Sequence, residues 1–173
     1  ISLPLDDETV RSLHVGDPVF LTGVMMTGRD AVHKWMIDTF IQNKRAPQGD
    51  DKKVYEAIRP ILAGSAIYHC GPVVVKENGV WVVKAAGPTT SIREEPYQGR
   101  VMAHFNAKGV IGKGGMGDKT LAACAEVPCV YFHAIGGAAT LIAQSVKKVL
   151  GVHKLDFGVR VEVAIMSMGL ESG

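Results

Sequence analysis

The stretch VVVKENGVWVV, residues 73–83, places Asn78-Gly79 between two runs of β-branched and aromatic residues. Asn-Gly in that setting is the strongest short-range signal for a tight β-hairpin. On the C-terminal side of this stretch the pattern changes, because short apolar runs alternate with longer segments of helical spacing. The elements expected there are strands at residues 109–111 and 129–133 and helices at residues 95–105, 119–125 and 138–150.

The N-terminal side of the hairpin shows the same alternation. The elements expected there are a helix at residues 6–13, a strand at 19–24, a helix at 31–42, a polar loop at 43–53 and a strand at 66–70. Asp6 is placed to cap the first helix. Strands separated by helices favour a parallel sheet with crossover helices. The sequence thus predicts an α/β fold with a parallel sheet layer, an antiparallel hairpin layer and crossover helices, in a β/β/α arrangement.

Composition limits the class of protein. The chain has 173 residues and a formal net charge of +2, which fits one domain with its own core. Positive and negative residues alternate, so we expect neither a nucleic-acid nor a membrane partner. No apolar run reaches the roughly 20 residues that span a bilayer, and the first residues do not resemble a signal peptide. Together with three cysteines of no repeated spacing, these features predict a cytoplasmic protein.

Three glycine-rich loops each follow an expected strand, and ligands of open α/β sheets bind at the carboxyl ends of strands. The first loop, Thr27-Gly28-Arg29-Asp30, puts Arg29 at a helix start, where backbone amides and the helix dipole favour an anion. Pairing of Arg29 with Asp30 or with solvent is an equally good interpretation. His33 and His69 lie next to these loops and could assist, although a core or surface place is the commoner role.

The second loop, Gly87-Pro88-Thr89-Thr90-Ser91-Ile92-Arg93, sets three hydroxyl groups ahead of an arginine. If a helix begins here, Thr89 and Arg93 lie one turn apart on the same face. A hydroxyl and a guanidinium so placed can hold a carboxylate together. The alternative is an ordinary helix cap by Thr90 or Ser91.

The third loop runs from Gly109 to Thr120. Gly112 and Gly117 have the spacing of a nucleotide-binding P-loop, but Asp118 stands where that motif needs lysine and would repel terminal phosphates. What remains is a cluster of backbone amides at a helix start, beside Lys113, which suits a smaller anion such as a carboxylate.

Arg29, Arg93 and Lys113 therefore form the predicted carboxylate-binding set, with Thr89 as a further reactive candidate. Three cations for two carboxylates suit a small dicarboxylic acid. Metal ligation is not favoured, because Cys124 and Cys129 lack the C-x-x-C continuation of an iron–sulfur run. The histidines do not have the H-E-x-x-H spacing, and no G-x-S-x-G elbow for a serine nucleophile occurs.

The loops together resemble the β subunit, or the C-terminal domain, of the class I iron–sulfur hydro-lyases, namely class I fumarase and L-tartrate dehydratase. The matching segments, in order from about Leu5 to about Phe157, are Thr27-Gly28-Arg29-Asp30 with His33, Cys70-Gly71-Pro72, Ala86 to Arg93, Val110 to Met116 and Gly136-Gly137-Ala138. The resemblance implies a swivelling β/β/α domain. It also implies a hetero-oligomer with an α subunit, or N-terminal half, that carries a [4Fe–4S] cluster on its own cysteines, so that this chain does not ligate the cluster.

The resemblance also assigns roles to residues. It implies that Arg29, Arg93 and Lys113, together with Gly114, bind the carboxylates of a four-carbon substrate, and that Thr89 is the catalytic base. An alcohol is a poor base unless positive charge stabilises its alkoxide; Lys113 is the expected source and is therefore catalytic as well. The cluster iron of the partner would act as a Lewis acid on the substrate.

Two segments depart from the family pattern. Residues 43–63 look longer than usual, and the run from Arg160 to Ser167 fits poorly. We therefore expect a single domain over residues 1–173 whose final segment, from about residue 158, is divergent or truncated. The expected activity is the reversible hydration of fumarate to (S)-malate. The alternatives are an L-tartrate dehydratase β subunit and a non-catalytic module that binds a small carboxylate.

Overall fold

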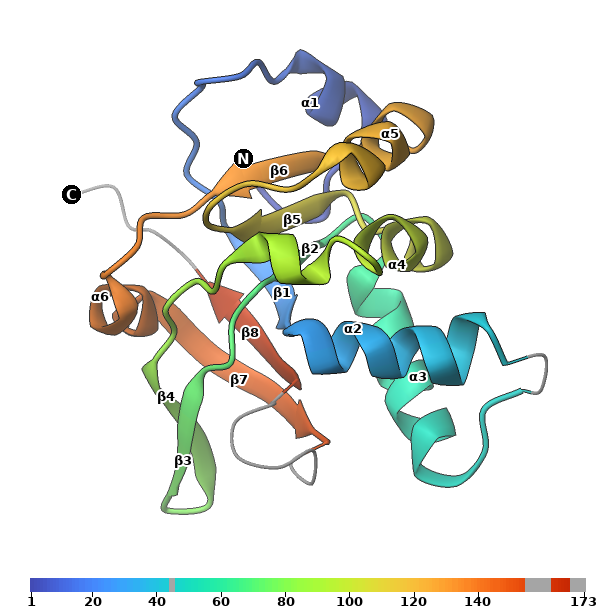
Figure 1. Ribbon diagram of the computed structural model, residues 1–173. Coiled ribbons are helices and arrows are strands. Elements are labelled where there is room, and N and C mark those ends of the chain that lie inside the picture. Colours follow the sequence, from blue (N-terminus) through green and yellow to red (C-terminus); the bar gives the residue numbers. More distant parts are fainter. Residues whose placement is uncertain (44–45, 155–162, 169–173) are drawn as a thin grey trace.

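The computed structural model describes residues 1–43, 46–154 and 163–168. Within these residues the chain forms a six-stranded sheet, in the order β6-β5-β2-β1-β8-β7, and a separate two-stranded hairpin (Figure 1). The parallel strands are β1 (Gly23–Thr27), β2 (Ala66–Tyr68), β5 (Gly109–Gly112) and β6 (Val130–His133). The antiparallel strands that extend the sheet are β7 (Val146–His153) and β8 (Val163–Met168). The predicted parallel sheet is confirmed, and two antiparallel strands extend it.

Successive residues of the parallel strands point to opposite faces of the sheet, as the period of two requires. On β1, Met26 is buried in the helix-covered core and its neighbour Met25 in the core on the other face. On β2, Ile67 and Tyr68 divide in the same way. Each parallel strand therefore supports two cores.

Helices cover one face of the sheet (Figure 1). They are α2 (Asp30–Met36), continued by the π-helical turn Ile37–Ile41, α3 (Gly49–Leu62) and α4 (Gln98–Phe105), with α5 (Asp118–Glu126) packed beside α4. Their apolar faces meet the sheet through residues such as Met36, Ile58 and Met102, all essentially buried. The other face is covered by the hairpin of β3 (Val73–Glu77) and β4 (Val80–Ala85) and by α6 (Ala139–Gln144).

The hairpin confirms the prediction from the Asn-Gly pair. Glu77 pairs with Val80 across the turn, and Asn78 and Gly79 both have positive φ, +49° and +83°. A two-residue turn with positive φ at both positions matches the twist of the flanking strands. The first helix is also confirmed: α1 (Asp7–Ser12) begins after Asp6, whose carboxylate accepts a hydrogen bond of 2.7 Å from the Thr9 amide.

Several predicted elements were wrong in extent. The strand expected at residues 19–24 begins at Gly23, and the loop expected at 43–53 is helical from Gly49 onward, where Asp50 and Asp51 favour a helix start. The helix expected at 138–150 ends at Gln144, because the chain then enters β7 and pairs with β8. The helix expected at 95–105 begins only at Gln98.

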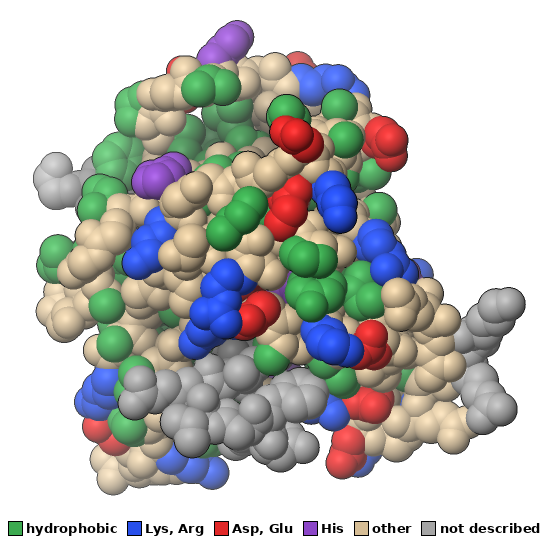
Figure 2. All heavy atoms as spheres, viewed as in Figure 1, with side chains coloured by type: hydrophobic (Ala, Val, Ile, Leu, Met, Phe, Trp, Pro, Cys, Tyr) green, Lys and Arg blue, Asp and Glu red, His purple; other side chains and the backbone are tan. Residues whose placement is uncertain are grey.

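The C-terminal strand β8 lies between β1 and β7 and runs antiparallel to both. The divergent segment expected from about residue 158 therefore includes one strand of the main sheet; its residues 158–162 and 169–173 lie outside the described residues. In the part of the chain that the structure describes, no helix is long and apolar enough to cross a membrane. Lys and Arg side chains lie interspersed with Asp and Glu on the face that Figure 2 shows.

Candidate active site

Loops that follow the four parallel strands meet at one edge of the sheet. Arg29 follows β1 as the N-terminal cap residue of α2, His69 follows β2 directly, and Lys113 follows β5 directly. The loop after β6 is held against the end of β5 by the Ala134 amide, which donates to the Gly112 carbonyl over 2.7 Å. Because parallel strands end at the same edge, the order of strands brings these loops together.

The loop that leaves the hairpin, residues 85–93, lies across this edge and carries Thr89. The carbonyl of His69 accepts two hydrogen bonds from Thr89, one from its amide at 2.7 Å and one from its hydroxyl at 3.0 Å. The amide of Lys113 donates to the Thr89 carbonyl over 3.2 Å, and the amide of Ser91 donates to the Lys113 carbonyl over 2.9 Å. Thr89 and Lys113, which lie on different sequence motifs, are thus backbone neighbours.

Arg93 joins the same loop to the first one. Its guanidinium donates to the Asp30 carboxylate over 2.7 Å, with both side chains at least one-third exposed. Asp30 therefore pairs with Arg93 rather than with Arg29, the partner considered from the sequence. A partly exposed ion pair contributes little stability, so its main consequence is geometric: it holds Arg93 beside the helix start that carries Arg29.

The predicted helical placement of Thr89 and Arg93 on one face was wrong. The helical turn is a 3₁₀ turn over Ser91–Glu94, which leaves Thr89 outside it. The ordinary cap was wrong too, because Thr90 precedes the turn without a side-chain hydrogen bond and the Ser91 hydroxyl contacts His69 at 2.8 Å instead. The glycine-rich segment here forms tertiary contacts in place of a regular helix.

The amides at the start of α5 already have an anion. The Glu95 carboxylate accepts hydrogen bonds from the amides of Gly117, Lys119 and Thr120 and from the Thr120 hydroxyl. Burial acts to raise the pKa of Glu95, but these hydrogen bonds outweigh it and lower the pKa. The predicted anion site at this helix start is therefore filled from within the chain, and Lys113 and Gly114 precede it in the loop. Gly114 is exposed and has a φ of +78°.

Two fully buried histidines lie beneath the loops. The rings of His33 and His69 pack edge to face with centroids 5.3 Å apart. His33 Nδ1 lies 2.9 Å from the Arg29 carbonyl oxygen. Burial lowers the pKa of His33, and burial together with the neighbouring His33 lowers the pKa of His69 to about 3. Both rings are therefore neutral at physiological pH.

Sequence reasoning missed the polar side chains that surround His69, of which Ser91 and Gln98 contact its ring. Ser91, Glu94 and Gln98 are buried, and Tyr131 is partly buried. Burial raises the pKa of the Glu94 carboxyl to about 7, and the negative charge of Asp30 adds to the effect. The available signal is the third hydroxyl of the Thr-Thr-Ser run, for which a helix cap is the alternative role.

The cysteines do not form a cluster site. Among the described residues, no group of three or more His, Cys, Asp or Glu side chains is placed to hold a metal ion. The Cys129 thiol donates to the Cys124 sulfur over 2.8 Å, whereas Cys70 is buried with the core on the other face of the sheet. The donor set of these residues does not fit a [4Fe–4S] cluster, which takes four cysteines in most sites.

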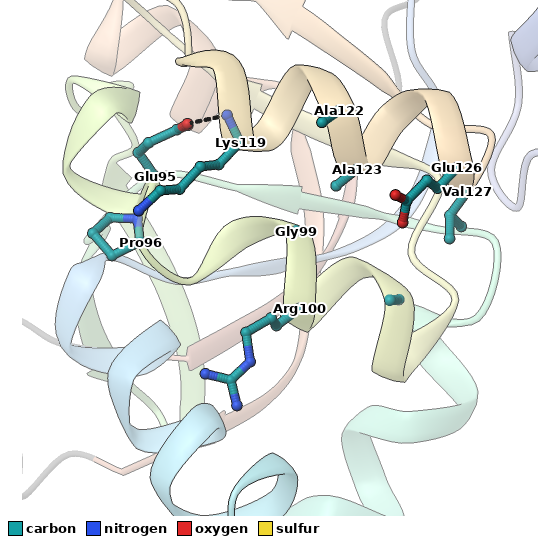
Figure 3. A pocket seen from close by; sticks show the side chains of 10 residues that line it. Glu95, Pro96, Gly99, Arg100, Lys119, Ala122, Ala123, Glu126 and Val127 are labelled. Atoms are coloured by element: carbon teal, nitrogen blue, oxygen red, sulfur yellow. Dashed lines mark hydrogen bonds between the residues drawn. The ribbon is translucent and has the colours of Figure 1, made fainter.

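A cavity of about 410 Å³ lies between α4 and α5 (Figure 3). Glu95, Arg100, Lys119 and Glu126 supply its charged lining. None of the predicted catalytic or substrate-binding residues lines it. The convergent loops, rather than this cavity, are the candidate active site.

Comparisons with known proteins show which family the chain belongs to. The sequence matches the fumarase C-terminus family over residues 2–172. It is 49% identical over 160 residues, 92% of this chain, to a Geobacillus stearothermophilus protein named "Putative fumarate hydratase class I". The chain spans only 28% of the length of that relative. It is 32% identical over 161 residues to the L(+)-tartrate dehydratase subunit beta of Escherichia coli (strain K12), covering 91% of this chain and 71% of that protein. The chain therefore belongs to the fumarase C-terminus family.

Proposed function

We propose that this chain supplies half of the active site of a class I hydro-lyase, which adds water reversibly to fumarate to give (S)-malate. One observation carries the proposal: two backbone hydrogen bonds place Lys113 beside the loop of Thr89, at the edge where Arg29 and Arg93 also lie. A hydroxyl beside several cations at strand ends suits proton transfer on a substrate with two carboxylates.

Each residue has a distinct role in this proposal. Arg29, Arg93 and Lys113, with Gly114, bind the two carboxylates. On hydration, a C–O bond forms at one alkene carbon and the Thr89 hydroxyl gives its proton to the other. The proton lost by the added water restores the Thr89 hydroxyl through solvent. In the reverse direction the Thr89 alkoxide, stabilised by the Lys113 ammonium, takes the proton from carbon.

The proposal also includes a partner. Since the described cysteines do not fit a [4Fe–4S] cluster, we place that cluster on a second chain or on an N-terminal half, in a hetero-oligomer. This chain is then one swivelling β/β/α domain over residues 1–173, acting in the cytoplasm. The family match over residues 2–172 and the hairpin layer beside the parallel sheet support the domain assignment.

L-Tartrate dehydration is the second candidate. It is favoured by the 32% identity to a protein named for that reaction. Fumarate and tartrate are both four-carbon dicarboxylates, so the same cations would serve either substrate.

The test is anaerobic reconstitution of this chain with its cluster-bearing partner, followed through the ultraviolet absorbance of fumarate. We expect the complex to interconvert fumarate and malate and either chain alone to be inactive. Activity from this chain alone would contradict a shared site. Activity on L-tartrate but not on malate would select the second candidate, and carboxylate binding without turnover by the complex would indicate a binding module.

A further inference from the structure

A chain of hydrogen-bonded side chains lies directly beneath Thr89 and Lys113. The His69 ring, fully buried, is its centre, with Nε2 at 2.7 Å from Gln98 Oε1 and Nδ1 at 2.8 Å from Ser91 Oγ. The Tyr131 hydroxyl continues the chain, donating to Ser91 Oγ over 3.1 Å. It ends at the Gly115 amide, which donates to the Tyr131 oxygen over 3.2 Å.

The chemistry of the donors fixes the direction of every bond. The side-chain oxygen of Gln98 can only accept a hydrogen bond, so His69 Nε2 must be the protonated ring nitrogen and the donor to it. In a neutral ring Nδ1 is then unprotonated and accepts a hydrogen bond, and the Ser91 hydroxyl is the donor. The Ser91 oxygen accepts from Tyr131 in turn, so the donors point one way from Gly115 to His69. Such a one-way series is mutually polarising.

The carboxyl of Glu94 does not replace Ser91 in this arrangement. Its Oε2 lies 4.0 Å from His69 Nδ1, beyond hydrogen-bond distance. Space is also tight around the serine, because a Cβ built on Gly112 would lie 1.8 Å from Ser91 Oγ and 3.1 Å from His69 Nδ1. The Ser91 hydroxyl therefore occupies space that is open because residue 112 is a glycine.

His69 holds the catalytic loop at two points. Its backbone carbonyl accepts both hydrogen bonds of Thr89, and its ring accepts the hydroxyl of Ser91 two residues later. The same Ser91 donates its amide to Lys113, and Tyr131 links the hydroxyl to Gly115 in the loop of Lys113. The buried ring is thus bonded to the loop of Thr89 through Ser91, and to the loop of Lys113 through the hydroxyls of Ser91 and Tyr131.

We propose that His69 is a positioning residue, whose neutral ring keeps the loop of Thr89 in register with the loop of Lys113. The catalytic consequence rests on the proposed function, whereas the hydrogen-bond series itself does not. The ring does not touch the substrate or exchange protons with it. Its effect is to fix where the Thr89 hydroxyl and the Lys113 ammonium stand.

The first test needs no activity. Imidazole and amide ¹⁵N spectra of the full chain at neutral pH should show His69 as the Nε2–H tautomer. Ser91→Ala should shift its Nδ1 resonance, and Tyr131→Phe should shift the Gly115 amide. Tyr55→Phe is the matched control, because the hydroxyl of Tyr55 on α3 lies 3.2 Å from His104 Nε2 on α4 and takes no part in the series. This variant should leave both signals in place. An Nδ1–H tautomer, a charged ring or unmoved signals would overturn the inference.

The second test measures kcat and KM on fumarate in the reconstituted complex. Ser91→Ala and Tyr131→Phe should each lower kcat about tenfold with KM changed less than about twofold, since displacement of the catalytic groups affects turnover before binding. Because the two residues act in one series, the double variant should fall no more than about twofold below the slower single variant. Multiplying losses, or an equal loss in Tyr55→Phe, would overturn the positioning role.

The two proposals fail in different ways. A wild-type complex without hydro-lyase activity would contradict the proposed function, and the spectra would then decide the place of His69 on their own. An active complex with unmoved spectra would contradict the positioning role and leave the proposed function standing.

Discussion

Lys113 has its backbone bonded to Thr89 and Ser91, and no carboxylate of the described residues pairs with its ammonium group. A charge without an internal partner at a strand end is available to a substrate anion. Lys113→Ala should lower kcat/KM of the reconstituted complex on fumarate by about tenfold to a hundredfold, as loss of a charge-assisted hydrogen bond does. Lys84→Ala, on the hairpin and paired with Glu77, is the matched control and should keep full activity. An unchanged rate for Lys113→Ala would remove it from the site.

Gly112 shows how little space the loops leave. A Cβ at this position would lie 1.8 Å from Ser91 Oγ and 3.1 Å from His69 Nδ1, so Ser91 would have to give up its hydrogen bond to the ring or the ring would have to move. Gly112→Ala should destabilise the chain by about 2–3 kcal/mol in urea unfolding, in the range of overpacked cores. Gly136→Ala is the control, since its Cβ would meet only Lys113 Cδ at 3.8 Å, and it should change stability by less than about 0.5 kcal/mol. Equal effects of both substitutions would show that the serine can shift freely.

Glu94 gives the chain a dependence of stability on pH. Burial, with the charge of Asp30, raises its pKa to about 7 from a model-compound value of 4.5. The folded state then binds more protons than the unfolded state between these values, so this residue's contribution to stability falls as pH rises from about 4.5 to about 7. Glu94→Gln removes this contribution. The unfolding free energy of the variant, relative to that of the wild type, should therefore rise by about 2 kcal/mol between pH 5 and pH 8.

Urea midpoints of the two proteins across that pH range measure the difference. Taking the difference cancels the opposite contributions of the buried histidines, which both proteins share. Glu77→Gln, at an exposed carboxylate on the hairpin, should track the wild type at every pH. A Glu94→Gln curve parallel to the wild type would show that the carboxyl is not held neutral.

At the scale of elements, local signals were sufficient where the partner is near in sequence. The hairpin was predictable because Asn78 and Gly79 meet the φ requirement of its turn, and α1 because Asp6 caps it. The end of α6 was not predictable in this way. Helical spacing continues past Gln144, but the segment pairs with β8, whose residues follow ten or more positions later. Pairing over that separation overrides local propensity.

The turn from α5 to β6 makes two thiols unequal. The hydrogen bond from Cys129 lowers the pKa of Cys124 and raises that of Cys129, while Cys70 is fully buried. Because the thiolate is the nucleophile, iodoacetamide should modify Cys124 first at neutral pH, severalfold faster than Cys129. Cys129→Ala removes the donor and should slow the reaction of Cys124. Peptide mass spectrometry after brief alkylation gives the order, and modification of Cys70 first would contradict the assigned burial.

For the whole molecule, the convergence of the loops was predictable and the contacts that hold them were not. Arg29, Arg93 and Lys113 stand in recognisable glycine-rich motifs, and parallel strands bring such motifs to one edge. His69, Ser91 and Tyr131 belong to three separate strands or loops, and each looks ordinary by itself. Only the register of β2 beside β5 and of β5 beside β6 sets them within hydrogen-bond distance. Burial of polar side chains is a property of the assembled sheet.

The sheet also depends on the C-terminal strand. β8 pairs with β1 on one side and with β7 on the other. Among the described residues, β8 is the only strand that pairs with β7. A chain that ends at residue 162 would leave β1 with an open edge and β7 unpaired. We expect it to lose at least about 3 kcal/mol of unfolding free energy, since the ladder bonds on two sides of β8 are removed together.

A chain that ends at residue 168 keeps every described pairing of β8 and is the control. Hydrogen exchange should show lost protection of the β7 amides that donate to β8 in the shorter chain, with the His69 amide, bonded to Ile111 of β5, still protected. Equal urea midpoints for the two chains would mean that the parallel strands and their helices are stable without β8.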